Sequence, residues 1–325
     1  MSFEVKDIYK KYGDKTVVNH LSFTMDKPGV YALLGTNGAG KTTSIRMILG
    51  MLLKDGGEVL FNGKPLDTGV TNVGYLAEER GLYPKVSLMD QMLYFAGLKK
   101  ISKKEAEKRI KYWSEKLKLD EYFYPQPPVG SRNKKVKPFR ADQLSKGNQQ
   151  KVQLMAALIA DPEIIILDEP LSGLDPVNTN LFRDVIHEVA AMNKYIIMSS
   201  HQMSTIEEFC SDLTILNHGK VVLQGNLKEI KKGYGRVNLV IKSDDDITDI
   251  VNEAGLKIAE KTAEEIMIKL DNESQASDLL ARLVEKKASV VKFELTEPSL
   301  HEIFVSKVGE EERSDSEEKG DEANE

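Results

Sequence analysis

The chain has 325 residues, of which 41 % are hydrophobic, so it is long enough for one large domain and one small one with a substantial core. No apolar run approaches the roughly 18 residues of a membrane span, and the N-terminus lacks the apolar core of a signal peptide. The single cysteine, Cys210, excludes an internal disulfide and suits a reducing compartment. We therefore expect a cytoplasmic protein that reaches a membrane only through partners.

The net charge of −6 is distributed unevenly along the chain. Residues 309–325 hold nine acidic and two basic residues, a net of −7, which leaves +1 for residues 1–308. The chain thus lacks the basic bias typical of nucleic-acid binding, and no nucleic-acid partner is expected. The tail 309–325 is charged, has no apolar residue except Ala323, and is expected to be disordered.

Residues 2–34 have the pattern of β structure, with strands expected at 3–5, 17–18, 21–25 and 30–34. Tyr12 is expected in the turn before the second of these strands. The last strand leads into a glycine-rich loop, and residues 44–49 are predicted to form the helix that leaves it. The loop fits the pattern G-x-x-x-x-G-K-[ST] with the residues Gly35, Thr36, Asn37, Gly38, Ala39, Gly40, Lys41, Thr42 and Thr43.

The loop has the chemistry of a triphosphate site. Its glycines let successive backbone N–H groups point inward without a Cβ clash, and the following helix turns its N-terminus towards the phosphates. Lys41 can reach the β- and γ-phosphate oxygens, and the Thr42 hydroxyl can bind Mg²⁺. The sequence therefore predicts binding of a nucleoside triphosphate with Mg²⁺.

The middle of the chain combines a hairpin with helices. The segment 58–63, with Asn62-Gly63, is a hairpin signal, 72–76 is a short strand, and 77–84 is a polar loop. Residues 87–120 have helical periodicity, and the proline-rich residues 122–131 are predicted to form an irregular loop. A basic cluster follows, which could contact phosphate or a membrane surface but is more often a solvated face: Arg132, Lys134, Lys135, Lys137 and Arg140.

The next segments alternate between helices and buried strands. Helices are expected at 145–160 and 177–192, and strands at 163–168, 195–199, 213–216 and 220–225. This alternation predicts an α/β domain with a largely parallel sheet, in which ligands bind at the carboxyl ends of the strands.

Polar side chains follow two of these strands. Asp168 and Glu169 end an apolar strand, where an aspartate can hold Mg²⁺ and a second carboxylate can act as general base on the attacking water. His201 ends the next strand and is a candidate contact for the γ-phosphate, although a lone histidine is more often structural.

Residues 233–308 repeat the alternation on a smaller scale. Strands are expected at 238–242, 257–259, 265–270 and 289–293, and helices at 247–251, 274–285 and 299–308. The order β-α-β-β-α-β followed by a helix predicts a small α+β module of ferredoxin-like type. The predicted organisation is a large domain at 1–232, this module at 233–308 and the acidic tail at 309–325.

Taken together, the motifs resemble the ATPase subunit of an ABC transporter over residues 2–230. Leu144-Ser145-Lys146-Gly147-Asn148 resembles the family's signature, usually Leu-Ser-Gly-Gly-Gln. Ser172-Gly173-Leu174-Asp175 resembles its dimer-contact loop and Ser200-His201 its switch histidine. Tyr12 falls where the family stacks an aromatic ring on adenine.

This resemblance implies a P-loop ABC-type fold with antiparallel β and helical subdomains, and a head-to-tail dimer holding two ATP molecules. Each ATP would lie between one phosphate loop and the partner's signature, which Ser145 and Gly147 represent here, with Asp175 nearby. The dimer, of identical or different ATPase subunits, would dock on integral membrane permease subunits at the inner face of the cell membrane. Ser145 suits its role because a helix N-terminus there presents a hydroxyl and N–H groups to phosphate.

The sequence departs from the family pattern in places. Lys146 and Asn148 replace the usual Gly and Gln of the signature. Glu78 stands where the family has a glutamine that senses Mg²⁺ and the permease, and it remains a candidate metal ligand. The segment Glu297–Phe304 resembles the ending of ATPases that serve exporters of antibiotics, bacteriocins or sodium.

The predicted function is ATP hydrolysis that powers export of a small molecule, peptide or ion through separate permeases. One alternative is an ABC ATPase acting on ribosomes or DNA, which the single phosphate loop and the lack of heptads disfavour. Another is a non-hydrolysing regulatory subunit, which is disfavoured because Lys41, Asp168, Glu169 and His201 are all present.

Overall fold

The computed structural model describes residues 1–79, 81–126 and 139–309. They belong to two compact units, Met1–Gln224 and Gly225–Glu325. The boundary expected from the sequence, between residues 232 and 233, falls inside helix α8 (Leu227–Tyr234) of the second unit. The acidic tail expected at 309–325 lies outside the described residues except for Gly309.

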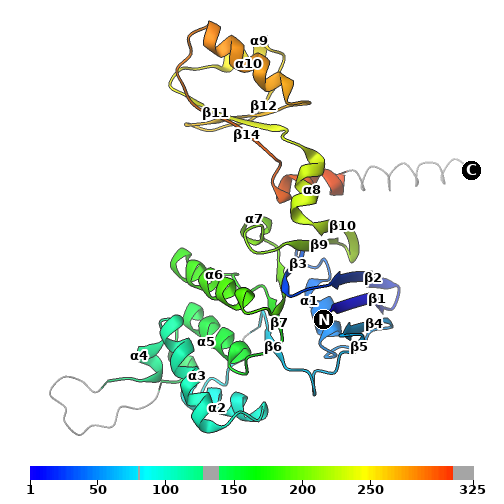
Figure 1. The fold of residues 1–325 in the computed structure, drawn as a ribbon, viewed down its shortest axis with the longest axis vertical. Helices are drawn as coiled ribbons and strands as arrows, with labels where there is room; N and C mark the ends of the chain where they lie inside the picture. Colours follow the sequence, from blue (N-terminus) through cyan, green and yellow to red (C-terminus); the bar gives the residue numbers. More distant parts are fainter. Residues whose placement is uncertain (80, 127–138, 310–325) are drawn as a thin grey trace, which may run out of the picture. The chain divides into compact units, whose positions relative to one another are not determined.

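The first unit begins with an antiparallel sheet of order β2-β1-β4-β5 (Figure 1). Its strands are β1 (Phe3–Tyr12), β2 (Lys15–Met25), β4 (Gly56–Phe61) and β5 (Lys64–Pro65). The turn at Asn62-Gly63 has positive φ at both residues, as a tight hairpin requires. The predicted position of Tyr12 in a turn was wrong, because β1 continues to this residue. Bulges along β1 break its period of two and hide its length in the sequence.

The second sheet has the order β10-β9-β3-β8-β7-β6. Its strands are β3 (Gly29–Gly35), β6 (Val73–Leu76), β7 (Ile164–Asp168), β8 (Tyr195–Ser200), β9 (Asp212–Asn217) and β10 (Lys220–Asn226). The pairs from β6 through β7, β8 and β3 to β9 are parallel, which confirms the predicted α/β class. The carboxyl ends of β3, β7 and β8 therefore meet at one edge.

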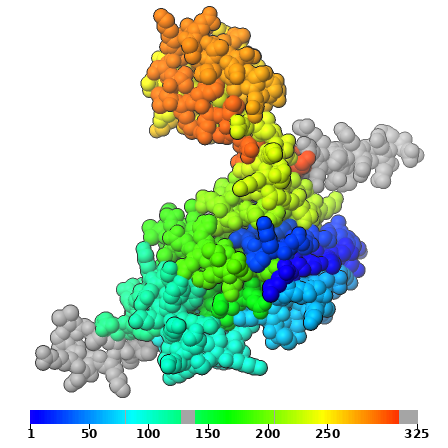
Figure 2. Space-filling model, in the orientation of Figure 1, coloured from blue at the N-terminus to red at the C-terminus, as the bar shows by residue number. Residues whose placement is uncertain are grey.

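The helices of the first unit are α1 (Lys41–Ile48), α2 (Leu88–Leu98), α3 (Lys103–Lys116), α4 (Asp120–Phe123), α5 (Lys146–Leu158), α6 (Pro176–Ala191) and α7 (Met203–Ile206), with a 3₁₀ turn at Ala141–Gln143. Among them, α2, α3 and α4 lie apart from the strands (Figure 1) and form the cyan part of the surface in Figure 2. Helices α2 and α3 contact each other and α5. This group is the helical subdomain, and α5 joins it to strand β6.

One loop prediction in this subdomain needs correction. Tyr122 and Phe123 belong to α4 rather than to an irregular loop, and Phe123 is buried. Residues 127–138 lie outside the described residues, and with them residues 127–131 of the predicted loop at 122–131 and the basic residues Arg132, Lys134, Lys135 and Lys137. The remaining member of the basic cluster, Arg140, pairs with Asp142 at 3.3 Å.

The second unit contains an antiparallel sheet of order β12-β13-β11-β14. After α8 come β11 (Asn238–Ser243), α9 (Thr248–Glu253), β12 (Lys257–Lys261), β13 (Ile266–Lys269), α10 (Ser274–Glu285) and β14 (Val290–Thr296), and residues 300–309 are helical. Apolar side chains of β11, β13, α9 and α10 form its core, including Leu239, Ile268, Val251 and Leu279. The order of elements matches the sequence-based expectation.

The helix at 300–309 is anchored by Glu302 at its start. The Glu302 carboxylate accepts hydrogen bonds from the backbone N–H and hydroxyl of Ser299, and Ser299 Oγ accepts from the Glu302 N–H, which makes a capping box. Asn238 on β11 and Lys269 on β13 also donate to Glu302. Partial burial favours the protonated carboxyl, but these donors outweigh it and lower the pKa of Glu302 to about 2.

Replacing Glu302 by alanine is expected to destabilise the second unit by roughly 1–3 kcal/mol, because Asn238, which is buried, loses the acceptor of its amide N–H. Since folding lowers this pKa, the wild-type advantage should be present at pH 7 and shrink as the pH falls below about 4.5. Urea unfolding of the full chain from pH 7 to acid checks both expectations. An equal loss from Glu297→Ala, at an exposed residue nearby, would contradict this role of the network.

Candidate nucleotide-binding and hydrolysis site

A cavity of about 290 Å³ lies where the phosphate loop meets the ends of the parallel strands. The N-terminal sheet contributes Val17 and the loop after β6 contributes Glu78, while Glu169 follows β7. The remaining lining comes from the phosphate loop and the first turn of α1: Asn37, Gly38, Gly40, Lys41, Thr42 and Thr43. The structure thus brings together residues that lie up to 152 positions apart in the sequence, from Val17 to Glu169.

The geometry of the phosphate loop depends on Gly40. This residue precedes α1 with a φ of 105°, and a Cβ there would lie 2.6 Å from the carbonyl oxygen of Val17. A larger residue would therefore be strained and would clash with backbone. With Gly40 in place, α1 starts at Lys41 and turns its N-terminal N–H groups towards the loop, which is the arrangement that binds phosphate.

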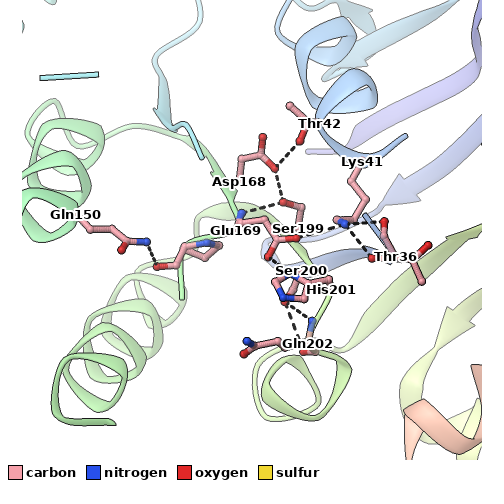
Figure 3. Close-up of polar contacts among 12 residues, drawn as sticks. Thr36, Lys41, Thr42, Gln150, Asp168, Glu169, Ser199, Ser200, His201 and Gln202 are labelled. Atoms are coloured by element: carbon pink, nitrogen blue, oxygen red, sulfur yellow. Dashed lines mark hydrogen bonds and ion pairs between the residues drawn. The ribbon is translucent and has the colours of Figure 1, made fainter. Parts of the chain in front are cut away.

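Lys41 is buried at the loop, with 6 % of its side chain exposed (Figure 3). Its Nζ donates to the carbonyl oxygens of Gly35 at 2.8 Å and Thr36 at 3.2 Å. The same atom lies 3.3 Å from Oε1 of Glu169. The ammonium is therefore fixed between the phosphate loop and the carboxylate proposed from the sequence as the general base.

Asp168, at the end of β7, is fully buried. Its Oδ1 accepts hydrogen bonds from Ser199 Oγ at 2.5 Å and from Thr42 Oγ1 at 3.3 Å. Its Oδ2 is buried and has no hydrogen-bond partner among the described residues. Burial raises the pKa of the Asp168 carboxyl, and the two hydroxyl donors oppose that rise.

These residues fit a Mg²⁺ ion. The unpartnered Oδ2 of Asp168 and the Thr42 hydroxyl are hard oxygen donors, and Glu78 lines the same cavity. Within the described ranges, no three acidic, histidine or cysteine side chains are grouped to hold a metal by themselves. The remaining ligands would come from phosphate and water, as is usual for Mg²⁺ in phosphoryl-transfer sites.

Glu169 has a left-handed backbone, with a φ of 50°, which is costly for a residue with a Cβ. Its N–H donates to Ser199 Oγ at 3.0 Å, and its Oε2 lies 2.9 Å from His201 Nδ1 (Figure 3). Its Oε1 is buried without a hydrogen bond among the described residues. The carboxylate, with 6 % of the side chain exposed, therefore lies between Lys41 on the side of Oε1 and His201 on the side of Oε2.

The signature residues lie at the start of α5. Ser145 is exposed and caps this helix by accepting the Asn148 N–H at 3.3 Å. Asp175 caps α6 in the same way, and the N–H of Asn178 is the main reason that the pKa of Asp175 is lowered. A Cβ on Gly147 would lie 3.0 Å from Asn178 Nδ2, so the two helix starts meet there. Ser145, Gly147 and Asp175 do not line the cavity of their own chain.

Tyr12 does not line the cavity either. Its ring is 54 % exposed and lies under Lys10 Nζ, 5.4 Å from the ring centre. Sequence reasoning missed two residues, Val17 in the cavity wall and Ser199 beside Asp168. The sequence marks Ser199 only as a polar residue at the end of an apolar strand. That it lies beside Asp168 follows from the register of β7 and β8.

Known proteins resemble this chain in both of its units. The family model "ABC transporter" matches residues 18–172, and the model "ATP-binding protein DrrA1-3-like, C-terminal domain" matches residues 225–308. The ABC transporter ATP-binding protein YhaQ of Bacillus subtilis is 42 % identical over 94 % of this chain and 98 % of its own length. The Nod factor export ATP-binding protein I of Burkholderia lata is 31 % identical over 68 % of this chain and 70 % of its own.

A solved structure of an ATP-binding subunit of an ABC transporter superposes with a TM-score of 0.63 at 28 % identity, covering 72 % of this chain and 94 % of the other. The chain belongs to the ATP-binding subunits of ABC transporters, and it is an ATPase that powers transport. Such subunits pair with membrane permease components. In the described part of this chain, no helix is long and apolar enough to cross a membrane.

Proposed function

We propose that the chain binds MgATP in this cavity and hydrolyses it with Glu169 as general base. The observation that carries the proposal is the position of the Glu169 carboxylate, 3.3 Å from Lys41 Nζ and 2.9 Å from His201 Nδ1. Lys41 neutralises phosphate charge, His201 fixes the base and the γ-phosphate, and Asp168 and Thr42 hold Mg²⁺ with Glu78 beside them. Hydrolysis by a Glu169→Gln variant tests the assignment.

The second half of the proposal is that ATP is shared between two subunits. Tyr12 covers the adenine, and the phosphates lie on the loop residues Gly35, Thr36, Asn37, Gly38, Ala39, Gly40, Lys41, Thr42 and Thr43. The partner subunit, identical or different, supplies Ser145 and Gly147 to the γ-phosphate, with Asp175 at the contact. Support comes from the exposure of Ser145 at a helix N-terminus outside its own chain's cavity.

The proposed permease contact is an apolar groove of about 300 Å³ in the first unit. It lies between β6, α2 and α5, and its wall continues through Ala77 into the loop that carries Glu78. Leu98, which is 62 % exposed, lies at its rim. An apolar groove next in the chain to the loop of Glu78 suits a helix or loop of the permease, and this contact would hold the chain at the inner face of the cell membrane.

Replacing Leu98 by glutamate is expected to lower the fraction of the chain bound to membranes that contain its permease by at least about tenfold, because a charge enters an apolar contact. ATP hydrolysis by the isolated chain should stay within about twofold of wild type, since Leu98 does not line the nucleotide cavity. Leu53→Glu, at an 85 % exposed leucine outside the groove, is the control. Equal losses in both variants would contradict the docking site.

Export is the proposed direction of transport, with a small molecule, peptide or ion as cargo. The support is the name of the Nod factor export relative and the exporter-like segment Glu297–Phe304.

We infer that the second unit is a ferredoxin-like accessory module, because β-α-β-β-α-β connectivity and the strand order β12-β13-β11-β14 are the features of that topology. Each residue of the nucleotide cavity lies in the first unit. A shortened chain of residues 1–226, which retains β10, should therefore bind MgATP within about threefold of the full chain. A folded 1–226 chain that no longer binds nucleotide would contradict this division.

A further inference from the structure

Ser199 lies on the strand that separates the phosphate loop from the acidic pair. In the parallel sheet, β8 runs between β3 and β7, and Ser199 is opposite Leu33 on one side and Asp168 on the other. Ser199 is fully buried and does not line the cavity. Its side chain therefore acts on Asp168 and Glu169 rather than on a bound molecule.

The Ser199 hydroxyl forms two hydrogen bonds in this position (Figure 3). It donates to Oδ1 of Asp168 at 2.5 Å and accepts the backbone N–H of Glu169 at 3.0 Å. A hydroxyl can donate one hydrogen bond and accept others, so one side chain serves two neighbouring residues of different function. Alanine can form neither bond, whereas threonine can form both.

The bond to Asp168 determines which carboxylate oxygen is available. Ser199 and Thr42 both donate to Oδ1, while Oδ2 has no partner among the described residues. A short hydrogen bond to an ionised carboxylate is strong and fixes its rotation. Without Ser199, only the longer bond from Thr42 would orient the group, and Oδ2 would no longer be fixed.

The bond to Glu169 holds an unfavourable backbone conformation. A φ of 50° costs on the order of 1–3 kcal/mol in a residue that is not glycine, so it persists only where neighbours enforce it. Ser199 is the neighbour that accepts the Glu169 N–H. If this backbone relaxes, the carboxylate moves away from Lys41 and His201.

We propose that Ser199 is a positioning residue for ATP hydrolysis, which orients the carboxylate of Asp168 and fixes the backbone of Glu169 through one hydroxyl. The inference rests on the proposed roles of Asp168 in Mg²⁺ binding and of Glu169 as base. Mutation of a residue that hydrogen-bonds to a metal ligand typically lowers metal affinity or activity by about 10- to 100-fold. Removal of a buried hydroxyl that has only a structural role would change the stability of the protein and neither its Mg²⁺ affinity nor its kcat.

Thr214 provides the matched comparison. It is fully buried on the adjacent part of the same sheet, in β9, and its hydroxyl bonds to the Tyr31 hydroxyl at 2.6 Å. Thr214 does not touch the cavity or the acidic pair. Thr214→Val therefore removes a buried hydroxyl of the same sheet without changing Asp168 or Glu169.

The experiment compares full-length wild type with the variants Ser199→Ala, Ser199→Thr and Thr214→Val. ATP affinity is measured in EDTA and across a Mg²⁺ titration, together with kcat and the melting temperature. For Ser199→Ala we expect ATP affinity in EDTA within about twofold of wild type, a Mg²⁺ midpoint raised roughly tenfold and a kcat lowered roughly 10- to 100-fold. Ser199→Thr should return the Mg²⁺ midpoint and kcat most of the way to their wild-type values. Thr214→Val should change only the melting temperature.

A Ser199→Ala variant with the wild-type Mg²⁺ midpoint and kcat would overturn the inference, as would equal changes in Thr214→Val. If the alanine variant is too unstable to purify, Ser199→Cys replaces it, since a thiol has nearly the same shape but is a weak donor. The variant Asp168→Asn distinguishes a failure of the proposed metal site from a failure of the role given to Ser199. An unchanged Mg²⁺ midpoint in Asp168→Asn refutes the proposed metal site, whereas a raised one beside a normal Ser199→Ala refutes only the role of Ser199.

Discussion

A Glu169→Gln variant is expected to bind MgATP normally and to hydrolyse it roughly 10²- to 10⁴-fold more slowly than wild type. Glutamine keeps the shape of the side chain and an oxygen for the bond to His201, which lies 2.9 Å from the carboxylate in the wild type. It cannot accept a proton from the attacking water at neutral pH, so the base is lost while the cavity is kept. The measurements are steady-state ATPase rate with the permease and nucleotide affinity of the purified chain.

The matched control is Glu163→Gln, the same substitution just before the strand β7, whereas Glu169 lies just after it. Glu163 is exposed, precedes β7 and does not line the cavity. Its rate should stay within about twofold of wild type, as is usual for an exposed substitution away from the site. Turnover near wild type in Glu169→Gln would remove Glu169 from the role of base.

Two inactive variants are expected to restore activity when they are combined in one dimer. Lys41→Ala removes the ammonium from the phosphate loop, and Ser145→Arg places a bulky side chain at the exposed start of α5. Each variant alone damages both sites of a dimer, and each should fall below about 1 % of the wild-type rate, as losses of 10²-fold or more are typical for phosphate-stabilising groups. In the mixed dimer, the intact Lys41 of one chain meets the intact Ser145 of the other.

If the sites are shared in this way, the mixed dimer has one whole site and should recover up to about half of the wild-type rate. The control dimer combines a wild-type chain with a chain that carries both substitutions. It contains the same two changes, but each of its shared sites is damaged once, so it should be inactive. The measurement is the ATPase rate of differently tagged chains, co-expressed and purified as the mixed species with the permease.

Unshared sites predict the reverse pattern. The wild-type chain of the control dimer would then keep a complete site, and the combination of single variants would have none. Full activity in either homodimer would contradict the role of the residue changed in it. The structural basis of the prediction is that Lys41 is buried in the cavity, whereas Ser145 is exposed and does not line it.

The parts of the site that the sequence predicted are those encoded by a continuous motif at the end of a strand. The loop from Gly35 to Thr43 and the pair Asp168-Glu169 belong to this class, because an apolar run followed by polar residues marks the carboxyl end of a buried strand. The parallel sheet and the order of elements in the second unit followed from the same periodicities.

The parts that the sequence did not predict depend on register or on irregular backbone. Ser199 bonds to Asp168 only because β7 and β8 pair in one particular register, and the two residues lie 31 positions apart in the chain. The full length of β1 was missed because bulges interrupt its alternation. Tyr122 and Phe123 were assigned to a loop because the prolines beyond them dominated the local signal, although the short helix α4 ends at Phe123.

The capping box at Ser299 and Glu302 gives the exporter-like segment Glu297–Phe304 a structural role. Ser299 and Glu302 are occupied with each other and with Asn238 and Lys269, while Leu300, Ile303 and Phe304 are buried. The segment therefore determines how the C-terminal helix packs on its sheet. Because these five side chains are hydrogen-bonded or buried, they are not available to bind a transported substrate. Chains that carry such a segment should share an architecture whatever they transport, so the determinants of substrate choice are to be sought in the permease.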